Sequence, residues 1–247
     1  MLIVANWKAY VEEGKRAKAL FALAKRLSGK YKHEIVLAPS FPQLGLLAPG
    51  NRTKVRFASQ DVSVVTGGAQ TGETTAQVVK DTGATYAIIG HSERRGSGED
   101  DAIVALKVQH ALAQGLIPIL CVGERERDQS AEYLGFVRAQ LAAVMAPLSQ
   151  KERMQVVVAY EPIWAIGKSA AEAILPADLA EMSLYIRKVL GDYLPGKAPA
   201  KTRVIYGGSV EPGNIRDLAA AGGIDGFLIG HASVEVPSFA SLVAAIS

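Results

Sequence analysis

The sequence predicts an α/β fold in which one domain, residues 1–247, forms a closed (β/α)8 barrel. Short apolar runs rich in β-branched residues alternate with longer segments rich in Ala, Leu, Glu and Lys. Such alternation is typical of parallel strands joined by right-handed helical crossovers. Eight apolar runs in 247 residues leave about 31 residues per unit, the size of a βα repeat. No Pro/Ser-rich linker or shift of composition divides the chain.

The apolar runs are mostly continuous rather than alternating, which indicates strands buried on both faces. They predict strands at residues 2–5, 34–38, 55–59, 86–90, 117–122, 155–160, 203–206 and 226–230. Apolar residues at helical spacing predict helices at residues 11–27, 102–114, 131–145, 178–190 and 212–221. A doubly wound open sheet is the alternative, but no Gly-x-Gly-x-x-Gly follows the first predicted strand to support it.

Composition excludes several classes of function. Apolar residues make up 49% of the chain, but no apolar run reaches the roughly 18 residues of a membrane span. The first residues lack the basic and long apolar stretches of a secretory signal. The single cysteine, Cys121, leaves no intramolecular disulfide and no cysteine-based metal cluster, and it suits a reducing cytoplasm. The net charge of +3 is spread over scattered basic residues. We therefore expect a cytoplasmic protein without a nucleic-acid or membrane partner.

Polar residues stand where the predicted strands end, and barrels of this class place their chemistry at the ends of strands. The set contains a carboxylate, an imidazole, a fixed cation, amides and glycine-rich loops. Its members are Asn6 and Lys8, Gln60, His91 and Glu93, Glu161, Gly207-Gly208-Ser209, and Gly230-His231.

These residue types fit the removal of a proton next to a carbonyl. Glu161 can serve as the general base, and His91, just before an expected helix start, can polarise a carbonyl or shuttle a proton. Asn6 and Lys8 lie two residues apart on one extended segment, so both can face the barrel mouth and stabilise a developing oxyanion. The set calls for no metal and no cofactor, and it fits enolisation and aldose–ketose isomerisation.

Two glycine-rich loops predict an anion site. Glycines 207, 208 and 230 let backbone N–H groups approach a ligand closely. Loops after the last two strands of such barrels often hold phosphate. A plain tight turn is the other interpretation of each loop, but two such loops on adjacent strands favour phosphate.

The run Ala-Tyr-Glu-Pro-Ile-Trp-Ala-Ile-Gly at 159–167 joins the proposed base to a candidate lid. Behind Glu161, Pro162 stiffens the backbone and Gly167 frees it. This arrangement indicates a catalytic glutamate beneath a closing loop. A capped strand end with an ordinary turn is the alternative.

Six motifs follow one another in the order of a known family and span nearly the whole chain. They are Asn6-Trp7-Lys8, Gly90-His91-Ser92-Glu93-Arg94-Arg95, Cys121-Val122-Gly123-Glu124, Tyr160-Glu161-Pro162-Ile163-Trp164-Ala165-Ile166-Gly167, Tyr206-Gly207-Gly208-Ser209-Val210 and Asp225-Gly226-Phe227-Leu228-Ile229-Gly230. Together they resemble the triosephosphate isomerase family, whose fold is the TIM barrel. The second and fourth motifs are each highly specific.

The resemblance implies interconversion of dihydroxyacetone phosphate and D-glyceraldehyde 3-phosphate through an enediol(ate), in glycolysis and gluconeogenesis, without a cofactor. It implies that Glu161 moves the carbon-bound proton, that His91 is the electrophile, and that Lys8 and Asn6 contact substrate and intermediate. Gly167, Ser209, Gly230 and the backbone of His231 would hold the phosphate. Three further implications are that Glu93 pairs with a neighbouring cation, that Tyr206 and Ser209 hydrogen-bond the closed lid, and that Cys121 is a buried thiol near the site.

The resemblance also implies a homodimer formed through the loop at residues 61–75. The tip of this loop is the run 68–73, and Thr71 would approach Asn6 of the other subunit. A polar loop without a partner is the alternative, although a loop this long inside a compact barrel more often has a function.

The chain departs from the family pattern at three places. After Gly167 one alignment deletes two residues and matches Lys168-Ser169-Ala170 to the second hinge of the lid, and another keeps the register and alters that hinge. His231 replaces a glycine, and we expect its imidazole to point to solvent rather than to the phosphate. Tyr10 should shape the subunit interface or pack on the first helix. Two alternatives to an active isomerase remain. One is a barrel that has lost catalysis and binds phosphosugar without turnover, and the other is a different phosphate-binding barrel enzyme.

Overall fold

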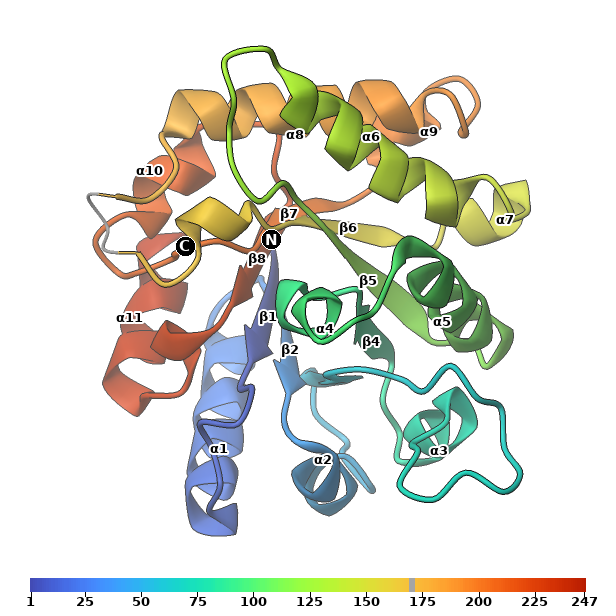
Figure 1. The fold of residues 1–247 in the computed structure, drawn as a ribbon. Helices are drawn as coiled ribbons and strands as arrows, with labels where there is room; N and C mark the ends of the chain where they lie inside the picture. The colour runs from blue at the N-terminus through green and yellow to red at the C-terminus, as the bar shows by residue number, and fades with distance from the viewer. Residues whose placement is uncertain (169–171) are drawn as a thin grey trace.

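The computed structural model describes residues 1–168 and 172–247 and shows eight parallel strands closed into a barrel (Figure 1). Each strand pairs with the next along the chain, and β8 returns to pair with β1. This confirms the predicted (β/α)8 barrel. The strands are β1 (Leu2–Asn6), β2 (Glu34–Ala38), β3 (Arg56–Ser59), β4 (Tyr86–Ile89), β5 (Ile117–Val122), β6 (Val157–Tyr160), β7 (Val204–Tyr206) and β8 (Gly226–Ile229).

Helices surround the strands, and each of the five predicted helices corresponds to one of them with ends shifted by a few residues. These are α1 (Gly14–Lys30), α5 (Asp101–Ala113), α6 (Glu132–Met145), α8 (Pro176–Leu190) and α10 (Ile215–Ala220). The prediction missed α11 (Val236–Ala245) and gave no length for α4 (Ser92–Gly96), although the helix start at 92 is correct. It also missed the short elements α2 (Phe41–Leu47), α3 (Ala76–Asp81), α7 (Gln150–Arg153), α9 (Ala198–Lys201), η1 (Ile163–Ala165) and η2 (His231–Ser233), most of which span too few turns to show a helical period.

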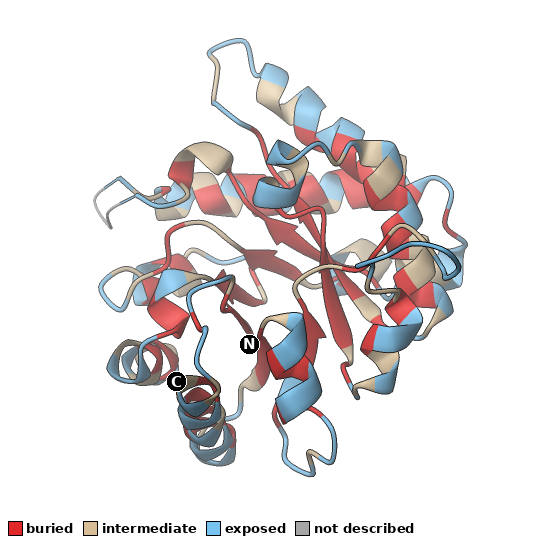
Figure 2. Cartoon of the chain, turned by 60° about the horizontal axis from the view of Figure 1, so that its bottom comes forward, coloured by how far each residue is buried: buried red, intermediate tan, exposed pale blue. Residues whose placement is uncertain are grey.

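The barrel separates two apolar cores. Side chains that alternate along the strands point either into the barrel, as Val4, Ile88 and Ile205 do, or outward against the helices, as Ile3 and Ile89 do. Figure 2 shows the result, with buried strands at the centre and helices that expose their outer faces. Strands buried on both faces explain why their sequences are continuous apolar runs.

The inward alternation continues beyond the carboxyl ends of the strands, and this positions the polar residues. Val4, Ala58, Ala159, Ile205 and Leu228 all belong to the inner core. Two residues further along each strand, on the same face, stand Asn6, Gln60, Glu161, Gly207 and Gly230. The rule that the chemistry lies at strand ends therefore follows from the two-residue period.

The segment between β3 and α3 forms a long loop that extends away from the barrel beside α3 (Figure 1). Residues 66–73 at its tip are exposed. Thr75 ends the loop and accepts a hydrogen bond from the backbone of Val78, capping α3. Within the described ranges, no helix is both long and apolar enough to cross a membrane.

Candidate active site

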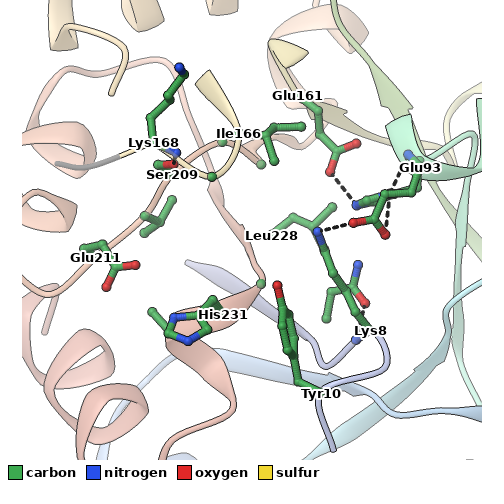
Figure 3. Close-up of a pocket in the computed structure, with 18 residues that line it drawn as sticks. Lys8, Tyr10, Glu93, Glu161, Ile166, Lys168, Ser209, Glu211, Leu228 and His231 are labelled. Carbon is green, nitrogen blue, oxygen red and sulfur yellow. Dashed lines mark hydrogen bonds and ion pairs between the residues drawn. The ribbon is translucent and has the colours of Figure 1, made fainter. Parts of the chain in front are cut away.

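A cavity of about 390 Å³ opens at the carboxyl ends of the strands (Figure 3). It gathers most of the residues that the sequence singled out. Thr71 lies outside it, exposed in the loop after β3, and Tyr206 does not line it. The lining residues are Asn6, Lys8, Tyr10, His91, Glu93, Glu161, Ile166, Gly167, Lys168, Gly207, Gly208, Ser209, Val210, Glu211, Leu228, Gly230, His231 and Ala232.

Glu161 is a buried carboxylate, only 3% exposed. Its Oε1 lies 3.3 Å from His91 Nε2, and its Oε2 accepts a hydrogen bond from the Ser92 backbone N–H at 3.4 Å. A Cβ on Gly207 would come within 2.6 Å of Glu161 Cγ, so glycine at 207 makes room for the carboxylate. The side chain is thus held inside the cavity with two polar neighbours.

His91 caps the amino end of α4, and this cap sets its tautomer. The ring accepts a hydrogen bond at Nδ1 from the Glu93 backbone N–H at 3.2 Å. In a neutral ring the proton must then be on Nε2. Because Nε2 faces Glu161 and the cavity, His91 presents an N–H donor to whatever binds there. The helix start predicted at 92 is therefore what orients the imidazole.

Lys8 reaches the cavity from a strained backbone. Its φ is +46°, a left-handed conformation that few residues with a Cβ adopt. Asn6 Oδ1 accepts from the Lys8 N–H at 3.1 Å, and the Gln60 amide donates to the Lys8 carbonyl at 2.9 Å. The expectation of one extended segment was wrong, because β1 ends at Asn6. Both side chains face the cavity through a turn that these bonds hold.

Glu93 pairs with a neighbouring cation, as expected. The Lys8 ammonium donates to Glu93 Oε1 at 2.7 Å. Burial raises the pKa of the Glu93 carboxyl, but the hydrogen bond and the charge of Lys8, with a contribution from His91, outweigh it and lower the pKa below its usual value. The carboxylate therefore stays ionised and restrains the lysine beside the cavity.

The candidate lid begins beneath the glycine-rich loop after β7. Ser209 Oγ accepts a hydrogen bond from the Lys168 backbone N–H at 2.9 Å, and the Ser209 N–H donates to the Ala165 carbonyl at 3.1 Å. Burial raises the pKa of Tyr206, and its buried hydroxyl has no hydrogen-bond partner among the described residues. Ser209 therefore holds the start of the lid segment, whereas the expected hydrogen bond from Tyr206 to the lid is absent among the described residues. The alternative hinge at 168–170 falls largely on Ser169 and Ala170, outside the described residues.

The first hinge of the lid is held by a carboxylate that the sequence interpretation left without a role. Glu124 is buried, and its Oε1 accepts from the Tyr160 hydroxyl at 2.8 Å and from Trp164 Nε1 at 2.9 Å. Arg127 lies over the Trp164 ring, 5.4 Å from its centroid. Glu124 follows β5 by two residues, so the strand-end rule could have found it.

Cys121 is a free, buried thiol, and the charged groups near it include Glu161, Arg95 and Lys8. Burial first, and then the charge and hydrogen bonding of Glu161, raise the pKa of this thiol well above its usual value. A thiol that resists ionisation is a poor nucleophile, so Cys121 fills space beneath the cavity.

Fold and site together define the class as a (β/α)8 barrel enzyme. A carboxylate, an N–H donor and an ammonium surround one cavity, and this arrangement suits proton transfer next to a carbonyl. A family model described as triosephosphate isomerase matches residues 1–246. A triosephosphate isomerase of Thermus thermophilus is 39% identical, over 98% of this chain and 97% of that protein. One of Herpetosiphon aurantiacus is 40% identical, over 98% and 97%. The chain belongs to the triosephosphate isomerase family, and its activity is an aldose–ketose isomerisation of triose phosphates.

Proposed function

We propose that Glu161, His91, Lys8 and Asn6 carry out this isomerisation. The observation that carries the proposal is the 3.3 Å approach of His91 Nε2 to a Glu161 carboxylate buried in the cavity. A base and a donor this close can act on adjacent atoms of one small substrate. The positions of Lys8 and Asn6 on the cavity wall complete the group.

The proposed reaction proceeds in two proton transfers. Glu161 takes the proton from the carbon next to the carbonyl, and the released electron pair forms the carbon–carbon double bond of an enediolate. The carbonyl oxygen gains the negative charge, which the Lys8 ammonium and the Nε2–H of His91 stabilise. Transfer of the hydroxyl proton between the two oxygens and return of the carbon-bound proton by Glu161 to the other carbon complete the isomerisation.

The phosphate would bind at the opposite end of the cavity. Gly167, Ser209, Gly230 and His231 line that end, and glycine lets backbone N–H groups approach an anion. The Lys8 side chain brings positive charge close to Gly230. Its Cε lies 3.6 Å from the position that a Cβ on Gly230 would occupy. The segment around Gly167, already bound to Ser209, would close over the substrate and exclude water.

We further propose that two copies of the chain associate through the loop at 61–75. Its exposed tip at 66–73 extends from the barrel without a helix or strand of its own, and such loops usually have a function. A second cavity of about 480 Å³ lies at the base of the loop, near Arg94 and Lys107. Thr71→Arg should shift the protein to monomers in analytical ultracentrifugation, whereas unchanged sedimentation would count against this interface. A cytoplasmic location fits the reaction and the free Cys121.

The decisive experiment is a coupled assay of the purified protein in both reaction directions. Glu161→Gln should lower kcat by about 10³-fold or more, because it removes the base while keeping the shape of the side chain. If the wild type and Glu161→Gln both lack isomerase activity but still bind phosphosugar, the result would instead support a barrel that binds phosphosugar without turnover.

A further inference from the structure

Two side chains form a wall of the cavity on the side of β1 and β8. Tyr10 comes from the loop after β1, and His231 opens η2 after β8. Both line the cavity, with ring centroids 5.7 Å apart and planes at 79°. This is the edge-to-face geometry that aromatic rings favour. Figure 3 shows Tyr10 between Lys8 and His231, with its hydroxyl directed toward the cavity.

The wall is anchored from behind by Arg16 of α1. Its guanidinium donates to the Tyr10 carbonyl at 3.0 Å and to the Val234 carbonyl at 2.9 Å, and it pairs with Glu235 at 2.5 Å. One arginine therefore ties the loop that carries Tyr10 to the segment that carries His231. His231 is exposed and Tyr10 is 48% exposed, so these contacts fix the backbone segments that carry the two rings rather than the rings themselves.

The side chain of His231 and its backbone N–H could each contact a bound phosphate. From the sequence we expect an imidazole directed at solvent, with only the backbone N–H in contact with phosphate. In the structure the residue is indeed exposed, yet it also lines the end of the cavity where Gly230 and Ser209 lie. A ring at this place can meet the phosphate of a bound substrate from the side away from the lid.

We propose that the His231 imidazole is an additional phosphate-binding group, which attracts the phosphate dianion in its imidazolium form, and that Tyr10 positions it. The proposal rests on the phosphate site proposed above. Histidine is the side chain that ordinarily gains a charge between about pH 8 and pH 5. An imidazolium at the edge of an anion site therefore makes phosphate binding tighter as the pH falls.

Other titratable groups face the same space and must be separated from His231. A comparison of variants at one pH cancels their effect, because the variants share them. They are Lys8 and Tyr10 after β1, His91 and Glu93 after β4, Glu161 and Lys168 around the lid, Glu211 after β7, and Arg16 and Glu235 behind the ring.

Sulfate is the appropriate probe because it stays a dianion over this range, unlike phosphate. Its inhibition constant against the isomerisation would be measured for wild type, His231→Gln and His231→Gly between about pH 5.5 and 8. The ratio of variant to wild-type inhibition constants should be near one at the alkaline limit and rise to about threefold to fivefold at the acid limit. His33→Gln, which removes an imidazole outside the cavity, should give a flat ratio.

Variants of Tyr10 provide a second test of the proposal. Tyr10→Ala should reproduce part of the loss seen with His231→Gln, because the ring loses its edge contact, whereas Tyr10→Phe should keep the wild-type pH dependence. Normal sulfate inhibition with a flat ratio for both His231 variants would overturn the role of His231 and leave the proposed function standing. No competition by sulfate in the wild type at any pH would remove the phosphate site and this inference with it.

Discussion

The two ends of the barrel use their polar residues differently. At the carboxyl ends, Lys8 keeps a left-handed backbone, and buried Glu161 faces a cavity. At the amino ends, Glu34, Tyr86 and Arg203 bind one another: the Tyr86 hydroxyl donates to Glu34 at 2.5 Å, and Arg203 donates to both partners at 2.8 and 3.0 Å. One end keeps its groups available to a ligand, and the other end satisfies them internally.

This difference suggests a division between activity and stability. A left-handed backbone at a residue with a Cβ costs on the order of 1 to 3 kcal/mol and persists where the surroundings impose it. The amino-end cluster joins β2, β4 and the residue before β7, and so connects strands that are not neighbours in the barrel. Substitutions at the two ends should therefore separate kcat from the free energy of unfolding.

The largest effect is expected at the carboxyl ends. Lys8→Met should lower kcat by about 10²- to 10³-fold, because it removes the ammonium that faces the developing oxyanion. The free energy of unfolding should change by less than about 1 kcal/mol, since the Lys8–Glu93 pair is largely exposed on the glutamate side. Steady-state kinetics and urea unfolding test this, with Lys25→Met on α1 as control. A stability loss as large as the activity loss would show that Lys8 serves the fold as much as the reaction.

At the amino ends the expected effect is on stability alone. Arg203→Met should lower the free energy of unfolding by about 1 to 3 kcal/mol, because Glu34 and Tyr86 lose a partner, while kcat stays within a factor of about two. Arg138→Met, which breaks an exposed pair with Asp192, should cost less than about 1 kcal/mol. Equal losses for the two arginine variants would show that the cluster is an ordinary surface pair.

The last effect concerns alkaline pH. Burial first, and then the hydrogen bond to Glu34, raise the pKa of Tyr86 from 10.0 to about 12. A folded-state pKa above the unfolded value means stability that is complete below pH 10 and lost as the pH rises toward 12. The stability difference between wild type and Tyr86→Phe should shrink there by up to about 1.4 kcal/mol per pH unit. A constant difference across this window would show that the phenol ionises alike in both states.

Sequence patterns predicted the barrel and the positions of Asn6, His91 and Glu161, because buried strands and their two-residue period are local features. They also placed Lys8 at the cavity, but they failed for its backbone, whose left-handed turn depends on bonds with Gln60 and Asn6. They also gave no role to Glu124 and did not place Tyr10 at the cavity, because partners such as Trp164 and His231 lie far away in sequence. Contacts between distant strand ends are what a local pattern lacks.

The role of Glu161 as the proton-transferring base is tested most directly by measuring hydrogen exchange at the substrate carbons. Isomerisation in D2O, monitored by NMR, should place deuterium from solvent on the reacting carbon, because a proton carried by Glu161 exchanges before it is returned. Glu161→Gln should abolish this incorporation while still binding sulfate. Deuterium incorporation by Glu161→Gln at the wild-type rate would contradict the role of Glu161 as the group that transfers the proton.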